Sequence, residues 1–309
     1  MRTVAVVGGS GFIGRAVVGA LRNADAVPVV VGKDDPADSD IEFHAADALD
    51  LRQMEAALYG CDAVVHLAAR SGGIQMQNEA GVFDENRAMT DTVLEASRRA
   101  GVQAVFLASS QVVYRDSTEP IPEEAPIVSS WDQPSQYAWS KATDEVVGRW
   151  WGEASGIRLV IGRFGNIYGP GASYDDERST VIHALVRRFG TAVPTDPVVV
   201  WGDGSAIRSF LFVDDAGRAV VDVLRGGESG SAYNIDSGEG ITIADLASIV
   251  RDTVSERLAI AYDGSKPVGV PYRVGSVARL QALGWVPRVS LRDGIRTTLA
   301  DYRRRFPSG

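Results

Sequence analysis

Short apolar runs alternate with longer amphipathic segments through the first half of the chain. The apolar runs are rich in β-branched residues and nearly free of charge, which is typical of strands buried on both faces of a parallel sheet. They lie at 3–7, 27–31, 62–67, 104–108 and 157–161. The amphipathic segments predict helices at about 50–58, 82–100 and 136–154. This alternation predicts an α/β fold built on a Rossmann-type, doubly wound parallel sheet.

A glycine-rich turn follows the first apolar run. Gly8, Gly11 and Gly14 stand three residues apart, and a helical pattern begins at Arg15. The first glycine permits a tight turn, the second lets the backbone approach a pyrophosphate, and the third lets the helix pack close to the strand. The free N–H groups of the helix would then face the phosphates. We expect a dinucleotide site here, including the residues Ser10, Phe12 and Ile13; an ordinary strand-to-helix turn is the alternative.

The pattern breaks after residue 168. A loop with Asp175, Asp176 and Glu177 precedes a predicted helix at 180–189, and proline-rich linkers follow. Segments 210–213 and 233–235 look like returns to the parallel sheet. Further helices are predicted at 246–254, 277–283 and 291–304. We therefore expect a dinucleotide-binding domain at 1–168, with returning segments at about 209–236, and a smaller C-terminal substrate-binding lobe at 169–309.

The end of the second strand indicates which cofactor binds. NAD-binding folds of this kind usually carry an acidic residue there, on the ribose 2′-hydroxyl. Here Gly32 and Lys33 leave room and positive charge for a 2′-phosphate, and Arg15 offers a second cation. We therefore favour NADP(H), with NAD(H) as the alternative cofactor. The alternative interpretation of Lys33 and Arg15 is a pair of solvated surface cations, which Asp34 and Asp35 next door support.

Asp47 follows the third strand and has two equally good interpretations. Its carboxylate suits the adenine amino group of the cofactor, or it caps the next helix.

Composition and net charge limit the classes of partner that this chain is expected to bind. The chain has 309 residues and a net charge of −9, which argues against nucleic acid or an anionic membrane as the main partner. No apolar run approaches the length of a membrane span, and Met1-Arg2 leads directly into the first strand. We expect a cytoplasmic protein without a signal peptide. Cys61 is the only cysteine, so the chain forms no internal disulfide or cysteine-based metal site, and we expect it to be a buried apolar residue.

Tyr137 and Lys141 open a predicted helix and stand one turn apart on one face. An ammonium beside a phenol favours phenolate, so we expect a lowered pKa for Tyr137 and a role as acid and base in carbonyl–alcohol interconversion. Ser110 ends a sheet strand, where its hydroxyl is suited to hold the carbonyl oxygen. A simple helix-surface contact is the alternative for the tyrosine–lysine pair alone.

With these residues the chain resembles the extended short-chain dehydrogenase/reductase family, also called NAD-dependent epimerases/dehydratases. The resemblance covers nearly the whole chain in order. It rests on the turn at 8–14, Asp47, His66-Leu-Ala-Ala69, Asn86, Ser109-Ser110, Tyr137 with Lys141, the segment 163–170 and Arg208-Ser-Phe210. It implies Ser110, Tyr137 and Lys141 as the reactive set, a nucleotide-linked sugar as substrate, and cofactor contacts from Ala48, Leu67, Ala68 and Ala69. Lys141 would also hold the nicotinamide ribose.

Within that family the chain is most similar to GDP-L-fucose synthase-like nucleotide-sugar reductases. The similarity lies in segments 66–74, 179–189, 198–215 and 262–271, and in Leu283-Gly-Trp285. It implies a substrate site formed by Ser110, Asn166, Val181, Leu185, Arg188, Trp201, Arg208 and Arg273. Arginine forks suit a diphosphate, and a tryptophan face suits a base or ribose. Core packing is the alternative for Trp201, and a solvated helix face is the alternative for Arg187 and Arg188.

The departures from that group point to the reaction. Its members epimerise C3 and C5 of the sugar with a cysteine and a histidine, where this chain has Val112 and Thr180. His183, one turn further on, is a conceivable substitute. Val268 replaces an expected aspartate, which puts guanine recognition in doubt. Gln111-Val112 replaces the Asp-Glu pair of the related dehydratases, so we do not expect 4,6-dehydration.

We therefore predict an NADP(H)-dependent reductase of the C4 ketone of a nucleotide-linked 4-keto-6-deoxyhexose. A nucleotide-sugar epimerase acting at C3/C5 or C4 with bound NAD(P) is the main alternative. A non-catalytic NADP(H)-sensing protein is an alternative of another class, which the complete reactive set disfavours. The resemblance also implies a homodimer formed through helices 82–100 and 136–154, although core packing is the expected role of Trp150 and Trp151.

Overall fold

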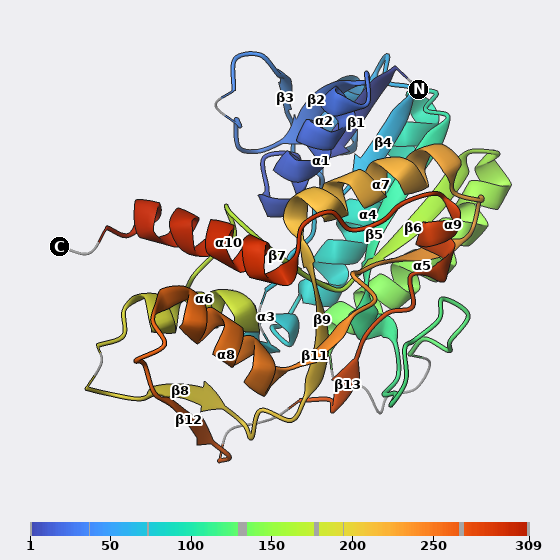
Figure 1. Cartoon of the computed structure of the whole chain (residues 1–309). Helices are drawn as coiled ribbons and strands as arrows, with labels where there is room; N and C mark the ends of the chain where they lie inside the picture. The colour runs from blue at the N-terminus through green and yellow to red at the C-terminus, as the bar shows by residue number, and fades with distance from the viewer. Residues whose placement is uncertain are drawn as a thin grey trace.

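A computed structural model describes residues 2–36, 38–72, 74–128, 135–175, 179–193, 195–265 and 269–307. A parallel sheet with helices on both faces forms one part of the molecule, and the later segments form a smaller lobe beside it (Figure 1). The predicted Rossmann-type architecture is therefore confirmed. No helix among these residues is long and apolar enough to cross a membrane.

Seven strands form the main sheet in the order β10-β6-β5-β4-β1-β2-β3, all paired in parallel. Chain order reverses between β1 and β4, and a ligand crevice is expected at such a reversal, outside the carboxyl ends of the strands. The strands are β1 (Thr3–Val7), β2 (Val27–Gly32), β3 (Glu42–Ala45), β4 (Ala63–His66), β5 (Ala104–Ser110), β6 (Arg158–Phe164) and β10 (Ala232–Ile235).

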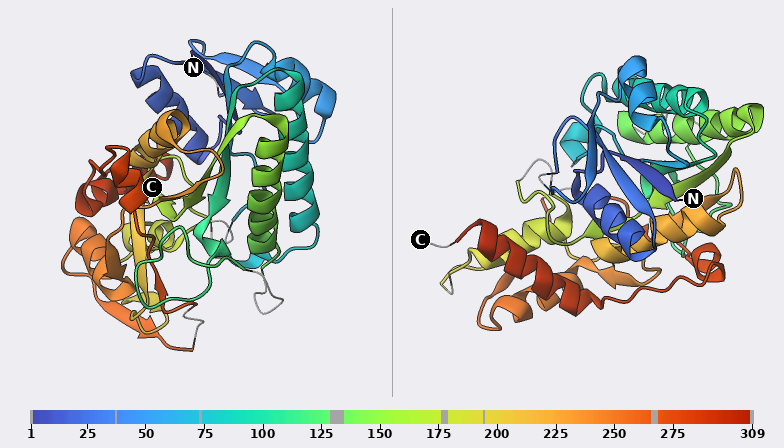
Figure 2. Two further views of the ribbon diagram at one scale, coloured as in Figure 1. Left: turned by 90° about the vertical axis from the view of Figure 1, so that its right-hand side faces the viewer. Right: turned by 90° about the horizontal axis from the view of Figure 1, so that it is seen from above.

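Both faces of this sheet are buried, as the uncharged strands predict. Val4 and Val6 of β1 belong to an apolar cluster with α1 (Phe12–Asn23) and α7 (Val213–Gly226). Ala5 and Val7 belong to a second cluster on the opposite face, because successive side chains of a strand alternate. Helices also cover that second side of the sheet (Figure 2). They are α2 (Leu51–Leu58), α4 (Val82–Arg99) and α5 (Gln136–Ser155), and the short α3 (Ile74–Gln77) and η1 (Gln111–Val113) lie between them in the sequence.

The lobe has its own apolar core and its own sheets. In the first, β9 (Ile207–Phe212) pairs with β7 (Asn166–Tyr168), β11 (Gly240–Thr242) and β13 (Tyr272–Arg273). In the second, β8 (Val198–Trp201) pairs with β12 (Ile260–Asp263). The lobe helices are α6 (Val181–Gly190), α8 (Ile243–Val254) and α10 (Leu291–Arg305), whereas the short α9 (Ala278–Ala282) packs through Leu280 into the apolar cluster of the main sheet.

The two predicted returns to the main sheet have different outcomes. Segment 233–235 does return, as β10 beside β6. Segment 210–213 does not: it ends β9 in the lobe sheet and begins α7. Both segments are apolar, and apolar character alone does not tell one sheet from another.

Asp236 joins the two parts of the molecule. It follows β10 and is buried, and its carboxylate accepts hydrogen bonds from Gln111 Nε2 at 2.6 Å, Ser209 Oγ at 2.7 Å and the Gly275 N–H at 2.8 Å. Burial raises its pKa, and these donors oppose that rise. The lobe is thereby fixed to the end of β5, next to Ser110.

Candidate active site

The glycine turn between β1 and α1 has the tight geometry that the sequence predicts. Gly8 has φ +83° and lies against the backbone of Ala68. A Cβ on Gly14 would stand 2.3 Å from the Gly8 carbonyl oxygen, so any side chain there would push the helix away from the strand. Each glycine therefore has a steric reason, as the dinucleotide interpretation requires.

The start of α1 fits the diphosphate of a dinucleotide. In the described structure, no side chain caps this helix at Gly11. A Cβ on Gly11 would meet only the Gly8 carbonyl oxygen, so its other side is open for close approach. The first N–H groups of a helix have no partner within the helix, and a phosphate satisfies them. Ser10, Phe12 and Ile13 belong to the same partly buried turn.

Lys33 and Asp47 pair with each other. Lys33 Nζ lies 2.9 Å from Asp47 Oδ2, and this contact is the main cause that lowers the pKa of Asp47. The helix-cap interpretation of Asp47 is wrong, because Asp50 caps α2 by accepting from the N–H groups of Arg52 and Gln53. Lys33 is 66% exposed and follows Gly32, where a Cβ would meet little but Ser10 Oγ at 3.9 Å. The room expected for a 2′-phosphate is therefore present.

Arg15 is placed differently from the sequence expectation. Its guanidinium donates to the carbonyl oxygens of Ser10 at 2.9 Å and Gly171 at 3.2 Å. This side chain links α1 to the turn after β7. These contacts use two of the five N–H donors of the guanidinium, so its role as a second cation for the 2′-phosphate stays a prediction.

The segment after β4 lies against the glycine turn. The Leu67 N–H donates to the Val7 carbonyl at 2.9 Å, which continues the parallel pairing, and Ala68 lies against Gly8. Ala69 is partly exposed beside them, while Ala48 beyond β3 is buried. Their positions at the carboxyl ends of neighbouring strands agree with cofactor contacts.

Tyr137 and Lys141 lie together on α5. Lys141 Nζ is 6.0 Å from the centre of the Tyr137 ring, and Lys141 is almost fully buried. The expected lowering of the Tyr137 pKa is wrong for this structure. Burial raises that pKa to about 12, and the charge of Asp144 adds to the rise. The sequence spacing revealed that Lys141 is near Tyr137. It did not reveal that the phenol is shielded from water or that the carboxylate of Asp144 is close enough to act on it.

Ser110 ends β5 at the same edge of the sheet. Its Oγ accepts from the Val112 N–H at 3.4 Å and lies 3.5 Å from the Phe164 carbonyl oxygen. Both contacts are long, so the hydroxyl is free to take a better partner. The neighbouring Gln111 donates through Nε2 to Asp236 at 2.6 Å.

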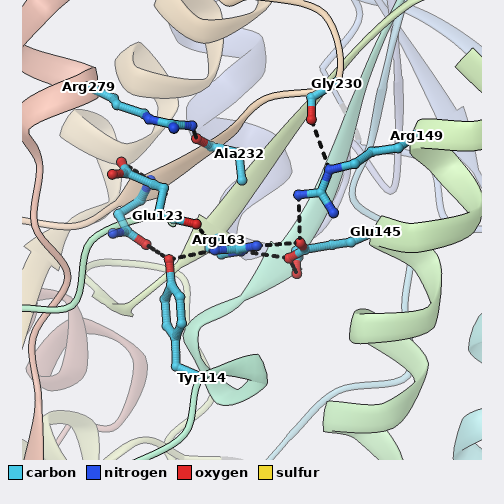
Figure 3. A network of polar contacts seen from close by, with 10 residues as sticks. Tyr114, Glu123, Glu145, Arg149, Arg163, Gly230, Ala232 and Arg279 are labelled. Atoms are coloured by element: carbon cyan, nitrogen blue, oxygen red, sulfur yellow. Dashed lines mark hydrogen bonds and ion pairs between the residues drawn. The ribbon is translucent and has the colours of Figure 1, made fainter. Parts of the chain in front are cut away.

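A buried polar network holds α5 against the sheet (Figure 3). Arg163 of β6 donates to both carboxylate oxygens of Glu145, at 2.8 and 2.6 Å. Glu145 also accepts from Ser109 Oγ at 2.6 Å, directly before Ser110. On its other side, Arg163 donates to Tyr114 Oη at 2.8 Å. The network thus fixes the helix that carries Tyr137 relative to the strand that carries Ser110.

The sequence interpretation missed the carboxylates Asp144 and Glu145 and the cation Arg87. A usable signal was present, because these carboxylates stand three and four residues after Lys141 and therefore share its side of the helix. Adjacent acidic residues in the middle of a helix with a largely apolar setting require buried partners.

Arg208 and Arg273 face each other across β9 and β13. Arg208 donates to the Val270 carbonyl, and Arg273 donates to the carbonyl oxygens of Gln111 at 2.5 Å and Tyr114 at 3.0 Å. Burial lowers the pKa of both guanidinium groups, and for Arg208 the charge of Arg273 adds to this. A pair of like charges beside Gln111 is suited to an anion next to the reactive edge.

The remaining predicted substrate residues are more scattered. Trp201 is 56% exposed, so core packing is the wrong interpretation, and the Arg188 guanidinium lies 4.9 Å from its ring centre. Val181 is partly buried at the start of α6, whereas Leu185 is fully inside the lobe core, which counts against a direct contact with substrate. Asn166 Nδ2 donates to the Ser209 carbonyl at 2.9 Å and so bridges β7 to β9.

His183 is not available as a base. It is buried, its Nδ1 lies 2.8 Å from Thr180 Oγ1, and its Nε2 lies 3.2 Å from the Gly169 carbonyl oxygen. Burial lowers its pKa to about 4, so the ring is neutral and packed against Phe12 and Tyr174. The suggested substitution of His183 for a missing epimerisation base is therefore wrong.

Some sequence predictions concern residues outside the described ranges. These residues are Asp176 and Glu177 of the predicted loop, Lys266, and Val268 with its bearing on guanine recognition.

Comparison with known proteins agrees with this geometry. The model of the NAD dependent epimerase/dehydratase family matches residues 4–236. GDP-L-fucose synthase 1 of Arabidopsis thaliana is 32% identical over 303 residues, which are 96% of this chain and 92% of that protein. The dTDP-4-dehydro-6-deoxy-D-allose reductase of Streptomyces bikiniensis is 30% identical, over 98% of this chain and 96% of its own length.

Solved structures support the same placement. UDP-glucose 4-epimerase of Thermus thermophilus, in complex with NAD, superposes with a TM-score of 0.82 and 27% identity, over 98% of this chain and 99% of that one. The fold, the family match and the relatives identify an NAD(P)-dependent oxidoreductase, as the sequence predicts. The chain belongs to the NAD-dependent epimerase/dehydratase family.

Proposed function

We propose that the protein reduces the C4 ketone of a nucleotide-linked 4-keto-6-deoxyhexose with NADPH. The observation that supports this proposal best is that the reactive residues and the pair of arginines lie at the same edge of the sheet. Arg273 donates to the Gln111 carbonyl, so the guanidinium pair suited to a diphosphate lies next to Ser110. Relatives named as a GDP-L-fucose synthase and a 4-keto-deoxysugar reductase, each about as long as this chain, support the same class.

The residues of the chain have separable tasks in this reaction. NADPH, when bound, supplies the hydride that reduces C4. Ser110 Oγ holds the ketone oxygen, and Tyr137 donates the proton that the oxygen takes up. Lys141 holds the nicotinamide ribose, and Arg208 and Arg273 hold the sugar diphosphate. The high pKa of Tyr137 suits a proton donor, because the phenol form then persists at neutral and moderately alkaline pH.

Nucleotide-sugar binding is tested by thermal shift. We expect GDP-, dTDP- and UDP-linked sugars to differ in how far they raise the melting temperature in the presence of NADPH, with one base preferred. The preferred nucleotide is then supplied as its 4-keto-6-deoxy sugar, and NADPH oxidation is followed. If no nucleotide sugar shifts the melting temperature and no 4-keto sugar oxidises NADPH, the proposal is wrong.

Tyr137→Phe should bind cofactor normally and lose most turnover. The substitution removes only the phenol proton, and general acid catalysis is typically worth about 100- to 10,000-fold. Turnover is measured from NADPH oxidation and cofactor affinity from fluorescence titration. Near-normal turnover would show that another group donates the proton.

Lys33→Ala should weaken NADPH binding about tenfold or more, because a lost charge-assisted hydrogen bond typically costs about 1.5–3 kcal/mol. NADH affinity should hardly change, since NADH lacks the 2′-phosphate. Arg22→Ala is the matched control, because Arg22 is another exposed cation, paired with Asp38 at the end of α1. Equal wild-type affinities for NADPH and NADH would reject the NADP(H) assignment.

Reduction should proceed without epimerisation. Removing a proton beside a ketone needs a base whose pKa lies near the working pH. Val112 and Thr180 provide none, and His183 is buried between Thr180 and Gly169. In heavy water with NADPH, the product should carry no enzyme-dependent deuterium at C3 or C5, as read by NMR. Deuterium at either carbon would favour the epimerase alternative.

We also propose a homodimer through α4 and α5, which lie side by side on the outer face of the sheet (Figure 2). Trp150 is 69% exposed on α5, so its expected role in the core is wrong, whereas Trp151 does pack against the core. Val146, one turn before Trp150, is also exposed. Sedimentation at micromolar concentration should give a dimer mass, and Trp150→Glu should shift it toward monomer. A monomeric wild type would contradict this proposal.

A further inference from the structure

A second buried carboxylate lies on α5 beside the reactive residues. The Asp144 side chain is 0% exposed, and its Oδ2 lies 3.5 Å from Lys141 Nζ. Its other oxygen, Oδ1, lies 2.5 Å from Arg87 Nη1 of α4. Oδ2 accepts no hydrogen bond of ordinary geometry from the described residues. It therefore faces the lysine mainly as a charge.

The other titratable groups packed around Lys141 do not replace this charge. His66 at the end of β4 is buried, and burial together with the Lys141 charge lowers its pKa to about 3, so it is neutral. Glu145, next on α5, is held by Arg163 of β6 and by Arg149. Arg87 of α4 is positive and lies on the far side of Asp144. Asp144 is thus the carboxylate in direct contact with the lysine.

We propose that Asp144 is a positioning residue that keeps Lys141 in place as an ammonium and keeps Tyr137 in its proton-donating form, so that the site favours reduction. This inference rests on the proposed function. A phenol protonates the product oxygen, whereas oxidation of an alcohol, the first step of a C4 epimerase, needs the phenolate. Asp144 acts by disfavouring a second negative charge at Tyr137 and by offsetting the positive field of Lys141.

The ionisation of Asp144 itself depends on its two cations. Burial raises its pKa, and the charges of Lys141 and Arg87 oppose that rise. Burial likewise lowers the pKa of Lys141, and Asp144 is the largest opposing cause. The carboxylate and the ammonium therefore stabilise each other in a site from which water is largely excluded.

The test is Asp144→Asn, which keeps the shape and removes the charge. Loss of the carboxylate should lower the pKa of both Tyr137 and Lys141, and either change makes reduction fail at lower pH. We expect the alkaline limb of kcat/KM for reduction to move down by about one pH unit. Asp91→Asn is the matched control, because Asp91 is an exposed partner of the same Arg87, and its profile should stay at the wild-type position. An unmoved limb in a folded Asp144→Asn protein would overturn the proposal.

If Asp144→Asn fails to fold, the double variant Asp144→Asn with Arg87→Gln removes opposite charges together and leaves no unpaired guanidinium. A smaller downward shift is expected, because the loss of the Arg87 charge raises the pKa of Lys141 and partly offsets the loss of Asp144. A second readout needs no substrate: the tyrosinate absorbance of Tyr137 with NADPH bound, taken as the difference from Tyr137→Phe. Its titration should move to lower pH in the Asp144 variant. An unchanged titration would reject the proposal, whereas a shifted titration without any reductase activity would reject only the proposed function.

Discussion

The contact between Glu145 and Arg163 is the interaction on which the rest of the site depends. Helix α5 and strand β6, which follows it directly in the chain, are joined by two short, buried hydrogen bonds. Ser109 donates to the same carboxylate, so the end of β5 is fixed as well. Breaking such a buried pair by removing one partner typically costs about 3–5 kcal/mol.

The neighbouring carboxylate gives α5 a second role. Glu145 is turned toward the sheet and serves the architecture, while Asp144 is turned toward α4 and Lys141 and acts on the chemistry. Of these two adjacent acidic residues, one fixes the position of α5 and the other places a negative charge beside Lys141. Asp236 completes the arrangement from the other side, since it ties Gln111 to the lobe that carries Arg208 and Arg273. The edge of the sheet that carries the reactive residues is therefore held in place by α5 on one side and by the lobe on the other.

The sequence predicts the sheet well, because strands buried on both faces leave a strong apolar signal and the glycine turn leaves a steric one. The sequence predicts less well those features that depend on contacts between residues far apart in the chain. The pairing of Lys33 with Asp47, the commitment of Arg15 to Gly171 and the placement of β9 in the lobe sheet arise from tertiary contacts. The pKa of Tyr137 shows the limit most clearly, since helical spacing reveals a nearby lysine and conceals burial. The burial of His183 against Phe12 and Tyr174 is likewise invisible to helical spacing, which is why the sequence suggested an available base there.

In the proposed function this site delivers one proton and one hydride to a ketone, and Val112, Thr180 and the buried His183 supply no base for the neighbouring carbons. The most direct measurement follows the hydride, with NADPH deuterated at C4 of the nicotinamide on the transferred face and a nucleotide-linked 4-keto-6-deoxyhexose as substrate. We predict a product with a single deuterium at C4 of the sugar, and one NADPH consumed for each product formed. Interconversion of sugars with no net consumption of NADPH, and no deuterium at C4, would contradict the account and indicate an epimerase.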